Sequence, residues 1–190
     1  MTRLIALAVV LCAACATSPS SEPAVTESQE IARPPFSGAE IRDATHPFRT
    51  YVYRREEAGQ PAKTYRMRFV DVDERGCRME ATFLDDEGQP LSEPMFSEAT
   101  WEELVAHASY PKDATVIRDV EVEVPAGTFD AWLYTVTEDK DGAAVVTRAY
   151  FAKALPGAPV LHVVTRDGVE VSRLVLLAYD PGGVEERVPR

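Results

Sequence analysis

The sequence predicts a mainly β domain: an antiparallel sheet of about eight strands with one covering helix. Two observations support this. Between residues 46 and 180, apolar side chains repeat with a period of two, which puts one face of each strand on a core and the other in water. Turn signals separate these runs, and the Asp-Gly pairs at 141–142 and 167–168 are typical of tight hairpins, because a type I′ turn needs positive φ at both positions.

The alternation is clearest in three runs. Residues 65–69 alternate large apolar side chains with arginine, and residues 77–83 alternate apolar with polar side chains. In the third run the valines at 116, 120, 122 and 124 share one parity, and the acidic residues at 119, 121 and 123 share the other. One helix interrupts the series: Thr100 and Glu103 have the spacing of a capping box, and an apolar stripe follows. We expect this helix to end near Tyr110-Pro111, since the residue before proline disfavours helix.

The last strand differs from the others, because residues 169–179 are apolar on both parities. Such a strand must be covered on both faces. The helix can cover one side, and the other must meet a second layer, a curled part of the sheet or a ligand. The pattern does not distinguish a fully buried central strand from a cavity wall.

The N-terminus resembles a bacterial lipoprotein signal. Arg3 precedes the apolar run Leu4–Leu11, and two alanines lead into Cys15, which can receive diacylglycerol. The apolar stretch is shorter than the roughly 18 residues of a membrane span. Ordinary signal cleavage, which would release a protein starting at Thr17, is the alternative.

These features divide the chain into four parts: a signal at 1–14, a lipidated and disordered tether at 15–45, the β domain at 46–180 and a flexible tail at 181–190. The tether has few large apolar side chains and cannot bury enough surface to order itself. Ala16 follows Cys15, and no aspartate stands there to suggest retention at the inner membrane. The expected location is the outer membrane, facing the periplasm, with a soluble periplasmic or secreted protein as the alternative.

Composition excludes several classes of function. The formal net charge of −11 disfavours nucleic acid and anionic lipid headgroups, so membrane attachment must come from the lipid. His46, His107 and His162 have no zinc-ligand spacing, and no Gly-x-Ser-x-Gly elbow occurs. Two acidic loops, 71–76 and 139–142, lack the acidic ligands that a calcium loop requires at other positions. We therefore expect no metal, no cofactor and no catalytic residue.

Two further features have competing interpretations. Cys77 would be a redox thiol only if a basic group or a second cysteine lay nearby, so a small buried hydrophobe is the better interpretation. Trp132, Tyr134 and Tyr150 lie on neighbouring predicted strands and are the candidate ligand-lining residues. They could stack on a ligand inside a curved sheet, or they could be cross-strand core pairs.

The C-terminal third of the domain resembles a family of uncharacterised bacterial envelope proteins. The resemblance rests on a Pro-Ala-Gly-Thr-Phe hairpin at 125–129, an aromatic strand at 148–151, a Pro-Gly turn at 156–157 and a last strand after 167–168. It implies the curved sheet of the periplasmic lipoprotein carrier, a half-barrel with a helix across its concave side. It implies no catalytic residue. The carrier has more helices than the single one that this sequence predicts.

Three classes of function follow, in order of preference. The first is non-catalytic binding of an apolar ligand or an envelope partner by a membrane-anchored lipoprotein. The second is a structural or assembly lipoprotein that has no ligand and uses a sheet edge or loops. The third is an enzyme, for which the sequence contains no motif.

Overall fold

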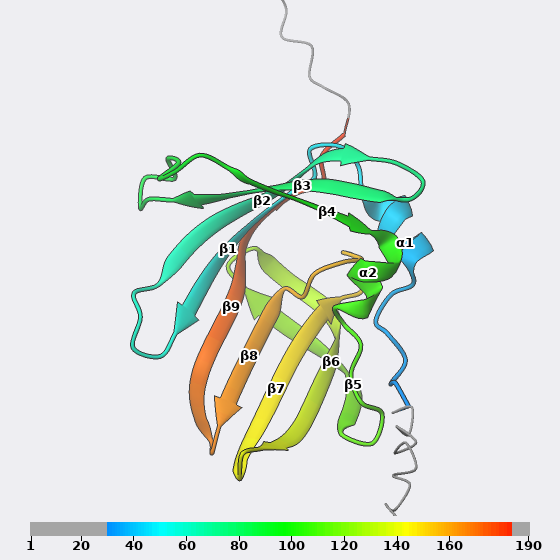
Figure 1. Cartoon of the computed structure of the whole chain (residues 1–190), viewed down its shortest axis with the longest axis vertical. Coiled ribbons are helices and arrows are strands. Elements are labelled where there is room, and N and C mark those ends of the chain that lie inside the picture. Colours follow the sequence, from blue (N-terminus) through cyan, green and yellow to red (C-terminus); the bar gives the residue numbers. More distant parts are fainter. Residues whose placement is uncertain (1–29, 184–190) are drawn as a thin grey trace, which may run out of the picture.

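A nine-stranded antiparallel sheet organises residues 30–183, the part of the chain that the computed structural model describes (Figure 1). The order across the sheet is β4-β3-β2-β1-β9-β8-β7-β6-β5, so the first and last strands pair at its centre. The prediction of an antiparallel curved sheet is confirmed, with nine strands and two helices in place of about eight and one. The strands are β1 (Thr50–Glu57), β2 (Lys63–Val72), β3 (Gly76–Leu84), β4 (Met95–Thr100), β5 (Thr115–Val124), β6 (Gly127–Lys140), β7 (Ala143–Ala152), β8 (Leu161–Arg166) and β9 (Val169–Asp180).

The Asp-Gly turns form as predicted. Asp141 and Gly142 have φ of 57° and 76°, and they join β6 to β7. Asp167 and Gly168 have φ of 49° and 81°, and they join β8 to β9. Positive φ at both central residues matches the twist of the flanking strands. These two turns therefore fix the register of the β6–β7 pair and the start of the β8–β9 pair, whose register shifts at Val164/Thr165.

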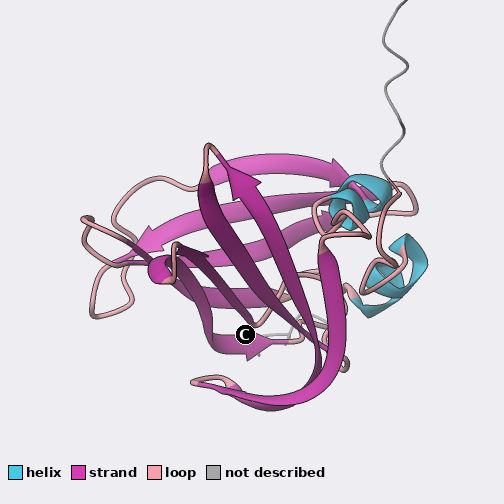
Figure 2. Ribbon diagram, turned by 90° about the horizontal axis from the view of Figure 1, so that it is seen from below, coloured by secondary structure: helices cyan, strands magenta, loops and turns pink. Residues whose placement is uncertain are grey.

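The register defines two faces of the sheet. Tyr53 lies opposite Tyr65 on β2 and opposite Leu176 on β9. On the same face, two residues before Leu176, Leu174 lies opposite His162 on β8, and that row continues through Ala149 on β7 to Tyr134 on β6. Residues directly opposite each other project from the same face. Both helices lie on the side of Tyr53 and Tyr134, which we call the helix-bearing face. In Figure 2 the two helices lie side by side at one flank of the curved sheet.

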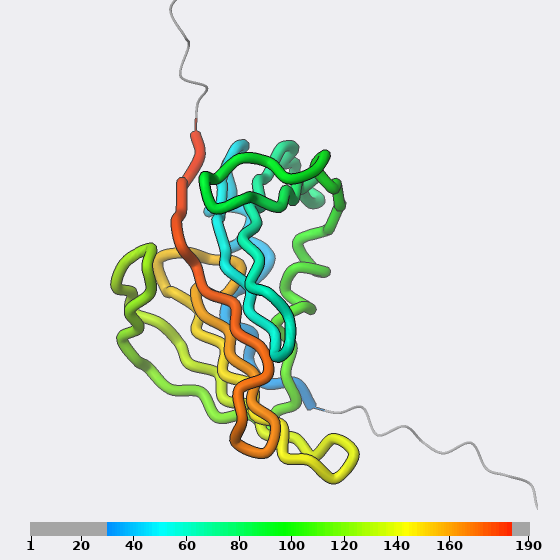
Figure 3. The backbone as a smooth tube through the Cα atoms, turned by 90° about the vertical axis from the view of Figure 1, so that its left-hand side faces the viewer, coloured from blue at the N-terminus to red at the C-terminus, as the bar shows by residue number. Residues whose placement is uncertain are grey.

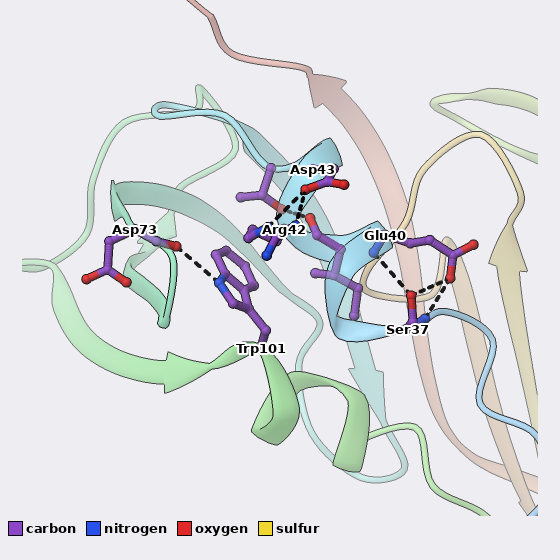
Figure 4. A network of polar contacts seen from close by, with 8 residues as sticks. Ser37, Glu40, Arg42, Asp43, Asp73 and Trp101 are labelled. Carbon is purple, nitrogen blue, oxygen red and sulfur yellow. Dashed lines mark hydrogen bonds and ion pairs between the residues drawn. The ribbon is translucent and has the colours of Figure 1, made fainter.

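The segment before β1 is ordered, which corrects the expected boundary of the tether at residue 45. Helix α1 (Gly38–Ala44) begins at Ser37, whose side chain and that of Glu40 cap each other's backbone (Figure 4). Phe36 and Ile41 are 3% and 4% exposed, and Phe36 packs on Phe151 and Trp132. We call residues 30–45 the N-terminal arm. Its few apolar residues reach the core although its overall composition is polar.

Helix α2 (Trp101–Ala106) has the predicted capping box between Thr100 and Glu103. It is shorter than expected, because it ends with His107 as its C-cap rather than near Tyr110. The buried Trp101 side chain anchors it, and the indole Nε1 donates to the Asp73 carbonyl at 3.1 Å (Figure 4). The helix is therefore fixed to the turn between β2 and β3.

The back face of β9 is covered by the sheet itself. The tip of the β5–β6 hairpin returns to β9, and the Ala126 amide donates to the Leu176 carbonyl at 3.3 Å. In Figure 3 this yellow-green hairpin lies beside the orange-red β9. Val122 and Val124 near the tip are both 7% exposed, and Val175, on the back face of β9, is half-buried. Of the three covers that the sequence left open for this strand, the structure has the curled sheet.

Candidate binding surface

A row of aromatic rings crosses the helix-bearing face from the centre of the sheet towards β3. Tyr51 stacks on Tyr53 with ring centroids 5.8 Å apart, Tyr53 is 5.7 Å from Tyr65, and Tyr65 is 6.3 Å from Phe83. Tyr51 and Tyr53 are each 1% exposed, whereas Tyr65 and Phe83 are only half-buried. The row thus runs from the core to a surface that solvent can reach.

The inner end of the row is covered by the loop between β7 and β8. The Tyr53 hydroxyl donates to the Pro159 carbonyl at 3.1 Å, and Gly157 of the same loop lies beside the Tyr51 hydroxyl. Burial raises the pKa of both tyrosines, so neither ionises in the physiological range. The loop does not extend further across this face, so it does not cover the side chains on β2, β3 and β4.

Beyond this cover lies an apolar surface on β2, β3 and β4. Its large side chains share the helix-bearing face, since Met67 lies opposite Tyr51, Phe83 opposite Tyr65 and Ala81 opposite Met95. Four of them are half-buried, and Met95 is 55% exposed. We call this set the apolar floor: Tyr65, Met67, Met79, Phe83 and Met95.

The apolar floor ends at two cations. A small pocket of about 110 Å³ is lined by Arg55, Lys63 and Phe83 together with part of the β1–β2 turn. The Lys63 ammonium lies 6.0 Å from the centre of the Phe83 ring, and the Arg55 guanidinium is paired with Glu57. Lys63 is in no ion pair within residues 30–183. One end of the floor therefore presents a cation beside an aromatic ring.

A larger pocket of about 450 Å³ lies at the β2–β3 turn, and two of its carboxylates, those of Asp73 and Glu103, are engaged in hydrogen bonds within the protein. The Asp73 carboxylate accepts the amides of Arg75 and Gly76, which lowers its pKa, and Glu103 caps α2. Burial raises the pKa of the Cys77 thiol, also in this wall, to about 11. A thiol of that pKa is protonated at neutral pH, so this pocket shows no activated nucleophile.

The structure separates the three aromatic residues that the sequence singled out. Trp132 lies opposite Phe151, and Tyr134 lies opposite Ala149, so both are on the helix-bearing face. Tyr150 lies opposite Leu133 and projects from the back face. The three side chains therefore do not form one site.

The N-terminal arm occupies the place where a ligand on Trp132 and Tyr134 would lie. The Tyr134 hydroxyl donates to the Arg33 carbonyl at 2.8 Å, and its ring packs against Tyr110 and Phe151. The Arg33 guanidinium lies 5.4 Å from the Trp132 ring. These two residues act as core and arm contacts, which was the alternative interpretation of the pattern.

Sequence reasoning missed the apolar floor. Four of its residues, in the predicted strands at 65–69 and 77–83, were taken as core side chains, and Met95 was not assigned to any strand. One signal was available: the inward positions of two successive strands are filled by Tyr, Met and Phe, which are longer side chains than the valines of β5. The extent of their cover could not be inferred, because it depends on where the β7–β8 loop ends.

No site for a metal ion is evident in residues 30–183, where no group of three or more His, Cys, Asp or Glu side chains comes together. None of the helices in the same residues has the length and apolar character needed to span a bilayer. Cys15, the expected site of lipid attachment, lies outside the described residues, as do the signal at 1–14 and most of the expected tail.

Comparison with known proteins supports the fold assignment. No protein-family model matches the chain, and no curated protein matches it. Among solved structures, the chain is similar to MucB in the crystal structure of MucB in complex with MucA(peri), with a TM-score of 0.52 and 12% sequence identity. The match covers 78% of this chain and 57% of that chain, so the chain spans little more than half of its structural neighbour. At this identity the likeness concerns the curved β-sheet fold.

Proposed function

We propose that this protein is a non-catalytic binding protein of the bacterial cell envelope, and that the apolar floor is the surface with which it binds. The observation that carries the proposal is the incomplete cover of that floor, which continues a buried aromatic row into solvent. Contiguous apolar surface of this kind marks interaction sites on monomeric proteins. Met67, Met79 and Met95 suit such a role, since unbranched thioether side chains adapt to irregular partners.

We favour a protein partner over a lipid. MucB, which shares the fold, is described in complex with MucA(peri). The apolar floor is an open surface rather than an enclosed cavity, and the pocket at its end, about 110 Å³, is smaller than the roughly 300 Å³ or more of typical small-molecule sites. An open floor with a cation at one end fits the apolar side chains of a partner segment better than a buried acyl chain.

We further propose that the protein is held at the outer membrane, facing the periplasm, by a lipid on Cys15. The signal-like segment before Cys15 supports this proposal. Diacylation with an added acyl chain gives stable anchoring where one chain does not. Cys15→Ala should move the protein from the membrane fraction to the soluble fraction or block its processing. Unchanged membrane partition would favour the start at Thr17 instead.

Native mass spectrometry of the protein isolated from envelopes tests the proposed function. The wild-type protein should carry a second polypeptide, and the double variant Met67→Gln, Phe83→Gln should lose it. Val169→Gln is the matched control, because Val169, the first residue of β9, is 67% exposed and is not part of the apolar floor. A wild-type protein without any bound species, or equal binding by the floor variant, would rule out this function. If the bound mass is that of an acyl lipid and not of a polypeptide, the partner is a lipid rather than a protein.

A further inference from the structure

We infer that β4 is a docking edge for an extended, basic segment of a partner polypeptide, which adds to the sheet as a further strand. This surface is distinct from the apolar floor, apart from Met95 at their boundary, and the inference does not depend on the function proposed above. It rests on three features of β4: its unpaired backbone groups, its exposed apolar side chains and the charge around it.

The outer edge of β4 presents unpaired backbone groups. The strand is the last in the order of the sheet, and β3 alone among the strands of residues 30–183 pairs with it. The Trp101 amide donates to the Arg75 carbonyl at 3.3 Å and so continues the β3–β4 ladder by one pair. Hydrogen-bonded and non-hydrogen-bonded pairs alternate along such a ladder, so Phe96 and Glu98 direct their N–H and C=O groups away from β3.

The next amide of β4 that points away from β3 does have a hydrogen-bond acceptor. The Thr100 amide, two residues further along β4, donates to the Glu103 carboxylate at 2.7 Å. Within residues 30–183, no hydrogen-bond partner is found for the outward amides of Phe96 and Glu98. Unpaired edge groups of this kind are a template for another strand.

Apolar side chains flank this edge on both faces of the sheet. Met95 is 55% exposed and projects from the helix-bearing face, and Phe96 is 51% exposed on the back face. Leu91, in the loop just before the strand, is 65% exposed. Side chains of an added strand would alternate between the two faces and meet an apolar neighbour on each.

The acidic charge around β4 indicates which kind of partner segment this edge would bind. Residues 85–103 contain seven acidic residues and no lysine or arginine. Glu93, Glu98 and Glu102 are exposed and form no ion pair within the described part of the chain. The nearby Arg78 guanidinium lies 4.4 Å from the Phe96 ring centre, where it covers the ring. A segment that alternates basic and apolar side chains complements this surface.

The other edge of the sheet is protected, which makes β4 the better candidate. On β5, charged side chains occupy 118, 119, 121 and 123, a common device against strand addition. The residues that lead into β5 are paired with the N-terminal arm, since the Ala32 amide donates to the Tyr110 carbonyl and the Lys112 amide to the Glu30 carbonyl, both at 2.8 Å. β4 has one charged residue among its six, Glu98.

A peptide titration tests the inference. The probe is a fluorescent Lys-Val-Lys-Val-Lys-Val-Lys peptide, with a Glu-Val repeat as its acidic counterpart, and anisotropy is measured on the full chain. Glu98→Pro removes an outward N–H that β3 does not use, a change that edge strands tolerate. The variant cannot donate this hydrogen bond to the peptide, and the proline ring hinders the close approach of the new strand. Binding of the basic peptide should therefore weaken by about tenfold or more. Glu98→Gln, which removes only the charge, should weaken it less.

Two controls separate this surface from others. Glu121→Pro makes the same change on β5 and should leave peptide binding unchanged. The floor variant Met67→Gln, Phe83→Gln should also bind the peptide, so the inference and the proposed function can fail separately. Hydrogen exchange should show that the peptide protects the amides of Phe96 and Glu98.

Several outcomes would overturn the inference. These are no binding of the basic peptide, equal binding of the acidic one, equal binding by Glu98→Pro, or protection elsewhere in the sheet. Protection of the Phe96 and Glu98 amides by raised protein concentration alone would show that a second copy of this chain, rather than a basic partner, occupies the edge.

Discussion

Arg49 is a buried cation that joins four parts of the fold. It is 1% exposed, and its Nη1 donates to the Thr45 hydroxyl at 3.1 Å and to the Pro156 carbonyl at 2.9 Å. Its guanidinium lies 5.0 Å from the ring centre of Tyr51 and 5.4 Å from that of Tyr179. Nε and Nη2 have no hydrogen-bond partner, and the two rings supply the compensating interaction.

Replacing Arg49 should therefore destabilise the fold. We expect Arg49→Ala to lower the free energy of unfolding by about 3 kcal/mol, because it leaves a cavity and removes the contacts to the arm and to the β7–β8 loop. Arg49→Met should cost less, since its unbranched chain fills the space between the rings without a buried charge. Urea midpoints decide the matter, and a loss below about 1 kcal/mol for Arg49→Ala would contradict this role.

His162 should make stability fall in mild acid. Burial lowers the pKa of its side chain, so the unfolded chain takes up a proton at a higher pH than the folded protein does. The stability it provides is complete above the ordinary histidine pKa of about 6.5 and is lost as the pH falls below that value.

We expect His162→Gln to flatten the slope of the unfolding free energy between about pH 6.5 and pH 5. Four carboxylates have pKa values that hydrogen bonds lower: Glu40, Asp73, Glu103 and Glu170. They change the free energy of unfolding at lower pH, and the variant should leave that change as it is. Chemical denaturation over this pH range measures the slope. Identical slopes in the variant and the wild-type protein would show that His162 is not the group responsible.

Gly127 sets the register of the β5–β6 hairpin. Its φ of 135° lies outside the left-handed region that a side chain occasionally adopts, so a β-branched residue is strained there, whereas Gly59, in an open turn, has a φ of 76°, nearer to that region. Gly127→Val should lower the free energy of unfolding by more than about 1 kcal/mol and by more than Gly59→Val does, because Val122 and Val124 depend on this register for burial. Equal urea midpoints for the two variants would show that the turn at Gly127 does not control the register of the hairpin.

Among the elements, the N-terminal arm has the largest consequence for stability. Deleting residues 16–45 removes the buried side chains of Phe36 and Ile41, each contributing about 2 kcal/mol, and should lower the thermal midpoint by more than about 5 °C. Deleting only residues 16–29, which have few large apolar side chains, should change it little. Differential scanning calorimetry compares the two, and equal midpoints would mean that the arm does not stabilise the sheet.

The elements also show what the sequence could and could not predict. Local signals gave the alternating strands, both Asp-Gly hairpins and the capping box of α2, because each depends on neighbouring residues. The arm was missed because Phe36 and Ile41 stand alone in a polar segment. The pairing of β1 with β9 joins the two ends of the domain, and no local pattern reports it.

The error over Tyr150 was avoidable. A two-residue turn at 141–142 pairs Lys140 with Ala143 and, counting back, Trp132 with Phe151. That register puts Tyr150 on the opposite face, and it follows from the predicted turn type alone. The exposure of the apolar floor could not be predicted in this way, because it depends on loops from distant parts of the chain.

For the whole molecule, the open sheet explains why a binding surface remains. The C-terminal half is closed by its own hairpin on the back and by the arm on the helix-bearing face. Within residues 30–183, the N-terminal half receives cover only near α1, α2 and the β7–β8 loop, so β2 and β3 keep an apolar stretch that these elements do not cover. The C-terminal half is thus covered on both faces, whereas the N-terminal half keeps the apolar surface that we propose as the binding site.

Site-specific photocrosslinking in intact cells tests this account most directly. A photoreactive phenylalanine analogue at Phe83 lies on the apolar floor, and the same group at Val169 lies at the exposed start of β9, outside the floor. The account predicts one discrete protein adduct from position 83 and none of that mass from position 169. The same adduct from both positions, or none from position 83, would contradict the claim that the apolar floor binds a partner.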